Sequence, residues 1–521
     1  MSDAVTTDRS ALSGSLSPGG PAAAAPPPAP LAPPARFAPF ARGPVLAAMA
    51  ALGVLLAATS NGYGFHRDEL YFRMLEPAWG YVDQPPLTPL IARTITSLVD
   101  EPWALRIPAI LAAGATVLVL ALIAREAGGG RLAQSLAAWG GASAASPMVF
   151  GHVFLTASID LVVWPLVALF TMRALLRGDG RWWLAAGLVT GLATYNKWLV
   201  VMLVVGIGIG LLALGPWRAL RSPWLWAGVG LAIVLALPNL AYQVANELPQ
   251  LRMGAALAED TDGEGRILTV PFLFLHVGPL LAPIWITGLV ALFRRPPWRD
   301  IRLFAIAFAF VVVATIAGGA QPFYPLGIVE ILFALGAVPA AEWMRTRVRR
   351  VLVWTAVALN AVVAALIALP LLPVALVDAT PWAGANPATG DTIGWPAYVE
   401  QIAGVVNGSD ASRPPIIVAS NYGEAGALDR YGPEFGIDPE TVFSGHNALW
   451  FQSQPPDSAV DVVFVGEISP RLASEFESCR TEARLDHGAD VDNEEQGLPV
   501  IRCTGLTAGW DDLWPRLAHL S

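Results

Sequence analysis

The sequence predicts an α-helical polytopic membrane protein that carries a small α/β domain at its C-terminal end. Of its 521 residues, 55% are hydrophobic and 14% are charged, whereas soluble domains carry about 25% charged residues. Apolar runs of about 20 residues recur up to residue 376, and each is long enough to cross a hydrocarbon core of about 30 Å as a helix. Acidic residues concentrate beyond that point, where the apolar runs stop.

We predict about eleven transmembrane helices within a domain covering residues 42–376. The expected spans are 43–61, 104–124, 131–149, 154–173, 182–196, 198–215, 223–242, 270–293, 302–319, 325–342 and 350–376. Residues 1–41 are rich in proline and alanine and lack an amphipathic period, so we expect a disordered cytoplasmic tail there.

Arginine placement predicts the orientation. With eleven spans, the clusters of arginines between the apolar runs all fall on one side, which the positive-inside rule assigns to the cytoplasm. The first polar loop, the 243–269 loop and residues 377–521 then lie outside the plasma membrane. The 243–269 loop is expected to be either a mobile lid or a plain solvated loop.

Lys197 marks a break between two spans. Residues 182–215 are apolar except around this lysine, and one helix of that length would measure about 51 Å, too long for a single crossing. Two short helices that meet near Lys197 at the outer surface satisfy the length and the arginine distribution. Lys197 is the only lysine of the chain, which favours a compact charge for a phosphate; the alternative is a lysine that snorkels at a helix end.

The first polar loop carries the densest group of ionisable residues. Asp68 and Glu69 begin a short interfacial helix, in which Tyr71 shares a face with Asp68. Asp83 is expected to cap a second helix that begins with two prolines. A functional lid and an ordinary charged interfacial helix are the alternatives.

Asp160 lies about two turns inside the fourth span. An unpaired acid at a helix centre costs about 2.5–3.5 kcal/mol on insertion scales, so we expect it at the floor of an outward-facing cavity or in a structural pair. His66, Asp68, Glu69 and His152 do not show the spacing of a metal site. The sequence therefore predicts no required cofactor and leaves a divalent metal open.

These motifs, in this order, resemble the GT-C glycosyltransferases of the protein mannosyltransferase and lipid A aminoarabinose transferase type. The resemblance covers roughly residues 45–345. The first motif is an acid pair with its tyrosine, Asp68-Glu69 with Tyr71, and the second is an aromatic and Pro-Pro-Leu segment, Tyr81 with 85–87. The later motifs are the second acid, Asp160, the Gly-Leu-Ala to lysine segment at 191–197 and the aromatic-Tyr-Pro stretch at 323–325. Gln84 departs from the family, because the aminoarabinose branch has lysine there.

The resemblance implies transfer of a sugar from a polyprenyl phosphate to an envelope lipid, glycan or protein outside the cytoplasm, with no nucleic-acid partner. Asp68 is the candidate base, Glu69 and Asp160 orient substrate or share that role, and Lys197 stabilises the leaving phosphate. Further candidate substrate-binding residues are Arg67, Tyr71, Tyr81, Gln84, Arg252, Arg266 and Tyr324.

Residues 377–521 are expected to form a separate extracytoplasmic domain. Strand-like runs lie at 415–419, 459–466 and 498–503, and helical patterns lie near 396–406, 422–431 and 469–477. Both cysteines of the chain, Cys479 and Cys503, fall here and are predicted to form a disulfide.

Two other classes of function are weighed against the transferase. A transporter or lipid flippase would show internal repeats and paired broken helices near mid-membrane, and the sequence shows no convincing repeat. A non-catalytic receptor for an envelope glycolipid would not need acids and a lysine gathered on one side of the membrane.

Overall fold

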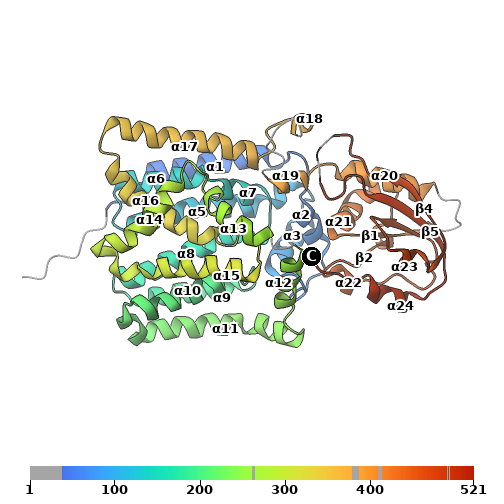
Figure 1. Ribbon diagram of the computed structural model, residues 1–521, viewed down its shortest axis with the longest axis horizontal. Helices are drawn as coiled ribbons and strands as arrows, with labels where there is room; N and C mark the ends of the chain where they lie inside the picture. Colours follow the sequence, from blue (N-terminus) through green and yellow to red (C-terminus); the bar gives the residue numbers. More distant parts are fainter. Residues whose placement is uncertain (1–37, 261–263, 378–385, 409–413, 490, 492) are drawn as a thin grey trace, which may run out of the picture. The chain divides into compact units, whose positions relative to one another are not determined.

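The computed structural model describes residues 38–260, 264–377, 386–408, 414–489, 491 and 493–521. Most of the predicted disordered tail, residues 1–37, lies outside this range, as does much of the expected domain boundary near residue 377. The described chain is mainly helical up to residue 377 and continues into a mixed α/β region (Figure 1).

The helical region follows the predicted apolar runs closely. Its helices are α1 Arg42–Thr59, α2 Arg67–Met74, α3 Leu87–Thr96, α4 Pro102–Leu105, α5 Ile107–Glu126, α6 Arg131–Ala142, α7 Ala145–His152, α8 Thr156–Leu176, α9 Trp182–Ala193, α10 Leu199–Leu214, α11 Pro223–Ala245, α12 Pro249–Asp260, α13 Glu264–Leu275, α14 Ala282–Arg294, α15 Leu303–Gly318, α16 Leu326–Trp343, α17 Arg347–Ala368 and α18 Val374–Val377. Short 3₁₀ turns, η1 Trp217–Arg221 and η2 Pro296–Ile301, join α10 to α11 and α14 to α15.

Six helical segments in the described part are long and apolar enough to cross a membrane, and five further apolar helices are shorter. The number eleven therefore stays a prediction, although a helix begins in or beside every predicted span. The expected break near Lys197 is confirmed, because α9 ends at Ala193 and α10 begins at Leu199. The bends between these elements explain why few helices reach full crossing length.

Four predicted segments are wrong in detail. The span 131–149 is split between α6 and α7 around Ser143, and the span 270–293 is split between α13 and α14, with Gly278 at a positive φ in the break. The last span ends at Ala368 rather than 376, ahead of Pro370. The 243–269 loop is largely helical, because it contains α12 and the start of α13.

Glu330 is an acid inside a predicted span that sequence reasoning overlooked. It lies in α16 and is 2% exposed, and neither of its carboxylate oxygens has a hydrogen-bond partner. The apolar residues on both sides of it made the run read as uniformly hydrophobic. Asp160 is therefore not alone as a buried acid of the helical region.

The C-terminal region is built on a five-stranded mixed sheet of order β2-β1-β3-β5-β4. Its strands are β1 Ile416–Ala419, β2 Val442–Ser444, β3 Val462–Val465, β4 Phe476–Arg484 and β5 Pro499–Leu506; β1, β2 and β3 are parallel, and β5 runs antiparallel to β3 and β4. The helices are α19 Pro387–Gly390, α20 Trp395–Asn407, α21 Tyr422–Tyr431, α22 Leu449–Gln452, α23 Pro470–Ala473 and α24 Trp510–Leu513, with 3₁₀ turns η4 Gly432–Phe435, η5 Pro439–Thr441 and η6 Trp514–Arg516.

Alternating side chains give this sheet two buried faces. Ile417 and Val463 pack with α20 and α21, whereas Ile416 and Val462 pack with the tryptophans that follow β5. The predicted strands and the first two predicted helices are confirmed. The helix expected at 469–477 is wrong, because only one turn forms before β4 begins at Phe476.

Cys479 and Cys503 form the predicted disulfide. They lie directly opposite each other on the neighbouring antiparallel strands β4 and β5. Cys503 is fully buried beside Phe476 and Trp510. The disulfide thus links the edge strand β4 to its neighbour β5, and these are the two longest strands of the sheet.

We predict that replacing both cysteines, Cys479→Ser with Cys503→Ser, lowers the stability of the C-terminal region. The bond spans 24 residues, and closing such a loop contributes around 3 kcal/mol in the chain-entropy model. Thermal unfolding should show a lower midpoint in the variant, and a reductant should lower the wild-type midpoint only. Non-reducing peptide mapping that finds two free thiols in the native protein would contradict the pairing.

Candidate active site

The site is built around α2, which begins in the first polar loop. His66 caps this helix: its Nδ1 accepts a hydrogen bond from the Asp68 amide at 3.1 Å, and its own amide donates to Glu69 Oε2 at 2.8 Å. This reciprocal arrangement is a capping box, which satisfies amide donors that a short helix would otherwise leave exposed. Asp68 and Glu69 therefore have fixed positions in the first turn.

Glu69 is tied into the helical region by a buried ion pair. Neither Glu69 nor Arg106 is exposed, and the guanidinium donates to both carboxylate oxygens at 2.9 and 3.0 Å. Arg106 also donates to the carbonyls of Ser60 and Gly64, and the Phe154 amide donates to Glu69. Each carboxylate oxygen of Glu69 thus accepts two hydrogen bonds, which favours the orienting role over the base role; the catalytic role of Glu69 stays a prediction.

Asp68 is half-buried on the same helix and faces the C-terminal region. Its Oδ1 accepts a hydrogen bond from the Tyr422 hydroxyl at 2.9 Å. The Tyr422 ring lies 4.7 Å from the Tyr71 ring and 4.7 Å from that of His446. Asp68 Oδ2 accepts no hydrogen bond from any residue that the structure describes, which leaves this oxygen for a substrate hydroxyl.

The C-terminal region reaches this site because α21 packs directly on α2. A Cβ at Gly426 would lie 2.7 Å from the Leu70 backbone, so only glycine allows this approach. Arg73 of α2 pairs with Asp429 of α21 and with Asp100. Leu70, on the apolar side of the expected interfacial helix, is fully buried under α21.

Asp160 and Lys197 approach the same place from α8 and from the break between α9 and α10. Asn196 connects them to the first loop: its amide nitrogen donates to Asp160 Oδ1 at 3.2 Å, and its oxygen accepts from Thr88 at 2.7 Å. Lys197 Nζ lies 5.4 and 5.1 Å above the rings of Phe323 and Tyr324. These distances are typical of cation–π contacts.

Lys197 interacts electrostatically with both Asp160 and Asp68. No carboxylate oxygen of a described residue lies within 4.0 Å of its ammonium group, and that group makes no hydrogen bond within the described chain. The charge is therefore held near the two acids without being paired. The described residues therefore leave the hydrogen-bond donors of the ammonium group unused.

Asp83 is a site residue to which sequence reasoning gave the wrong role. Helix α3 begins at Leu87 with no side-chain cap, so Asp83 does not cap it. Its Oδ1 is inaccessible to solvent and has no hydrogen-bond partner. Burial raises the pKa of Asp83 to about 7, hydrogen bonds from its own backbone and from Tyr71 oppose the rise, and the nearby Asp68 adds to it. Asp83 thus lies beside Tyr71 and Asp68.

Three of the predicted substrate-binding residues have other contacts. Arg67 pairs with Glu494 and stacks on Tyr422, the Tyr81 hydroxyl donates to the Glu76 carbonyl, and Arg252 of α12 pairs with Glu247, which precedes that helix. A fourth, Arg266, is exposed on α13. The structure brings none of these side chains into contact with Lys197 or Asp160. Gln84 is buried, and its amide nitrogen has no partner.

The described residues contain no group of three or more His, Cys, Asp or Glu side chains that could hold a metal ion. Asp68 and Asp160 are the acids that interact with Lys197, and Asp83 lies near Asp68. Metal dependence stays untested.

Comparison with known families gives one match within the helical region. Residues 83–242 match the family model of dolichyl-phosphate-mannose-protein mannosyltransferases. This segment contains Asp83, Asp160 and Lys197 but begins after Asp68. No curated protein matches the chain in sequence.

Solved structures of ArnT share the fold of this chain. ArnT from Cupriavidus metallidurans bound to undecaprenyl phosphate superposes with a TM-score of 0.57 at 15% identity, over 88% of this chain and 97% of that chain. Its apo state gives 0.57 at 15%, over 89% and 98%. The archaeal oligosaccharyltransferase AglB from Archaeoglobus fulgidus, in complex with an inhibitory peptide and a dolichol-phosphate, gives 0.43 at 12%, over 73% and 62%.

The predicted GT-C fold is therefore confirmed, including the small C-terminal region, since the ArnT match covers almost the whole chain. The family model and this fold favour a transferase over a transporter.

The ion pair that anchors α2 yields a first prediction for this site. Arg106→Ala leaves the Glu69 carboxylate buried without its partner, which costs about 3–5 kcal/mol of folding free energy. The exposed pair of Arg252 and Glu247 offers a matched control, because Arg252→Ala should cost about 0–1 kcal/mol. Apparent melting temperatures in detergent compare the two.

Joint replacement of the buried pair, Arg106→Met with Glu69→Leu, should recover part of the stability that Arg106→Ala loses. The anchoring of α2 by the ion pair of Glu69 and Arg106 would be refuted if Arg106→Ala were no more destabilising than Arg252→Ala.

Glu424, in the first turn of α21, should make the stability of the folded protein depend on pH. Burial raises the pKa of Glu424 to about 8, and Glu495 nearby adds to the rise, against about 4.3 for an unfolded glutamate. The folded state then binds more protons between these values, so stability is full below about pH 4 and falls as pH rises through about 8. Glu424→Gln should reduce this loss by at least about 1.4 kcal/mol, the equivalent of one pKa unit.

Melting temperature measured from pH 5 to 9 checks this, with Glu467→Gln as the control because Glu467 is exposed. Equal slopes for wild type and Glu424→Gln would show that Glu424 is ionised in the folded protein at neutral pH.

Proposed function

We propose that the protein is an integral membrane glycosyltransferase that moves a sugar from a polyprenyl phosphate to an acceptor hydroxyl. The observation that carries this proposal is the convergence of Asp68, Asp160 and an unpaired Lys197 from three elements distant in sequence. The family-model match and the ArnT fold support the donor class, since that ArnT structure contains undecaprenyl phosphate.

The proposed reaction is a direct displacement. Asp68 Oδ2 accepts the proton of the acceptor hydroxyl while the acceptor oxygen forms a bond to the anomeric carbon. The bond between that carbon and the phosphate oxygen breaks, and its electrons stay on the polyprenyl phosphate. Lys197 stabilises the charge that develops there. Asp160, which is held by Asn196, orients the ammonium group, and Tyr422 holds Asp68 in place.

The acceptor class and the orientation are also proposals. An envelope lipid, glycan or protein would reach Asp68 past Tyr422, so the C-terminal region would contribute to acceptor recognition. The arginine clusters and the disulfide both support a cytoplasmic position for the arginine-rich ends and an extracytoplasmic position for the site.

Fusion of a periplasm-dependent phosphatase tests this orientation. We expect a fusion at Ser521 to be active and a fusion near Arg347, between α16 and α17, to be inactive, because the two positions lie on opposite sides of the membrane. The opposite pattern would place both the site and the disulfide in the cytoplasm and overturn the orientation.

Substitutions in the site test the chemistry. Asp68→Asn keeps the shape of the side chain and removes the base, which should lower turnover about 10²–10⁴-fold. Lys197→Ala should also cripple turnover, and Lys197→Arg should restore it in part only, because a planar fork replaces a compact ammonium group. Asp457→Asn, at an exposed loop position, should leave turnover unchanged.

The measurement is transfer from a polyprenyl-phosphate sugar by purified variants, with the melting temperature as a check on folding. If the Asp68→Asn variant turned over as fast as wild type, the base role would pass to Asp160 or Asp83. If wild type consumed no polyprenyl-linked sugar but moved a lipid or solute across vesicles, the transporter hypothesis would replace this one.

A further inference from the structure

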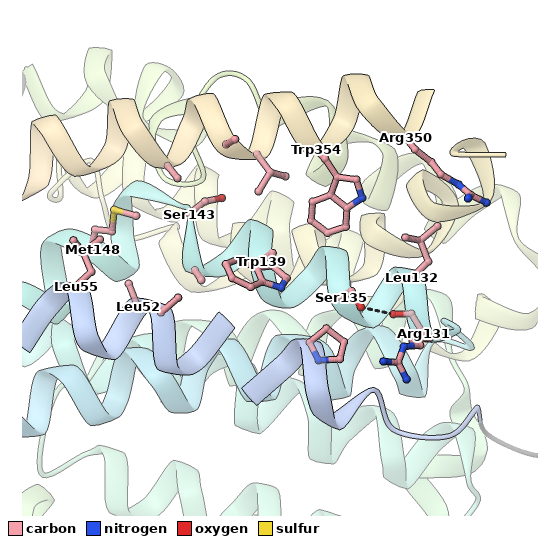
Figure 2. A pocket seen from close by; sticks show the side chains of 16 residues that line it. Leu52, Leu55, Arg131, Leu132, Ser135, Trp139, Ser143, Met148, Arg350 and Trp354 are labelled. Carbon is pink, nitrogen blue, oxygen red and sulfur yellow. Dashed lines mark hydrogen bonds between the residues drawn. The ribbon is translucent and has the colours of Figure 1, made fainter. Parts of the chain in front are cut away.

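A second feature of the helical region is an elongated cavity of about 940 Å³ between α1, α6, α7 and α17. Figure 2 shows the side chains that line it. Most are apolar, and among them Leu52 and Leu55 come from α1, Trp139 from α6 and Trp354 from α17. The candidate active site contributes no residue to this cavity.

The cavity has one charged end. Arg131 and Arg350 both lie at the right-hand end in Figure 2, on opposite sides of the cavity, whereas Met148 and Leu55 lie at the left-hand end. None of the lining residues is acidic. The Arg131 guanidinium makes no hydrogen bond or ion pair with another residue in the described chain, and Arg350 uses its Nε on the Met344 carbonyl. Two exposed cations therefore border an apolar groove.

The surroundings reinforce the attraction for an anion. Arg131 is the first residue of α6, a twelve-residue helix whose N-terminus has no side-chain cap, and helix N-termini favour negative charge. The nearest acid along the chain, Glu126, is already paired with Arg173 and Arg177. Within the described residues, no acidic side chain pairs with Arg131 or Arg350 and no side chain caps the start of α6.

The length of the groove corresponds to one membrane leaflet. On α1 it extends from Pro44 to Leu55 and on α17 from Arg350 to Ala361, which is about 16 Å on each helix at 1.5 Å per residue. Half of a hydrocarbon core of about 30 Å has nearly this depth. The arginines then lie at the level of lipid headgroups, and the apolar residues lie at the level of acyl chains.

The charged end is remote from the candidate active site. Helix α5 begins beside Arg106, which binds Glu69, and ends at Glu126, shortly before Arg131. Its 20 residues separate the two ends by about 30 Å. A polyprenyl phosphate with its phosphate at Lys197 would have its headgroup at the opposite membrane surface, which favours a different lipid in this groove.

We propose that the groove is a binding site for an anionic glycerophospholipid of the leaflet on the arginine-rich side. Its phosphate binds Arg131 and Arg350, and its acyl chains lie along Leu52, Leu55 and Met148. The lipid bridges α17 to α1 across the groove, and a ligand that binds only the folded state stabilises it by mass action.

The test measures binding of dioleoylphosphatidylglycerol to the purified full-length protein in detergent, by native mass spectrometry and by lipid-dependent thermal shift. We expect phosphatidylglycerol to raise the melting temperature and dioleoylphosphatidylcholine to have little effect. The double variant Arg131→Gln with Arg350→Gln should bind phosphatidylglycerol at least about tenfold more weakly. Arg221→Gln, outside the groove and exposed, should bind it as wild type does.

A second variant tests the apolar part of the groove without changing its charge. Ala361→Phe narrows the space for the acyl chains and should also weaken binding, while its melting temperature without added lipid shows that it folds. Equal binding by wild type and the double arginine variant, or equal binding of the two phospholipids, would overturn the proposal. Competition with undecaprenyl phosphate is a further test. If undecaprenyl phosphate displaced phosphatidylglycerol at a concentration lower than phosphatidylglycerol needs for its own binding, the occupant would be the carrier lipid and the proposal would be overturned.

Discussion

The buried ion pair between Glu69 and Arg106 fixes the helix on which the candidate site depends. Burying two charges is costly unless their remaining donors and acceptors are also satisfied, and here the guanidinium binds two further backbone carbonyls. Neighbouring residues on a helix point about 100° apart. Anchoring Glu69 in the helical region therefore turns Asp68 away from it, toward Tyr422.

Because α2 is held from one side, the C-terminal region can close over its other side. Gly426 lets α21 approach the backbone of α2, and Arg67 and Arg73 of α2 pair with Glu494 and Asp429. The separate domain expected from sequence is consequently part of the candidate site. Tyr422, which contacts Asp68, lies at the start of a helix that the sequence predicted near 422–431 without a function.

Sequence patterns predicted the features that depend on local composition. The apolar runs, the break at Lys197, the acid pair of the first loop and the cysteine pair all have signals in short windows of sequence. What could not be predicted depends on contacts between distant segments. Arg67 looked like a phosphate ligand because Glu494 is more than 400 residues away in sequence, and Asp83 looked like a helix cap because its burial beside Tyr71 requires the folded loop.

Two predictions of secondary structure were wrong for related reasons. The 243–269 segment carries mixed charges that suggested a loop, yet α12 forms there with an exposed polar surface. At 469–477 the periodicity agreed with a helix, but pairing of β4 with β5 through the cysteines determines the structure from Phe476 onward. In β4, pairing with a neighbouring strand outweighs a weak local preference for helix.

Arginine and lysine have different roles in this structure because the two cations differ in geometry. Among 32 lysine and arginine residues there is a single lysine. The planar guanidinium of Arg106 binds a carboxylate with two parallel hydrogen bonds, as fixed structural pairs require. Lys197 instead rests on two aromatic rings, which offset part of the cost of burial without neutralising its charge. A compact cation held in this way keeps its donors for an anionic ligand, which an arginine locked to Asp160 could not do.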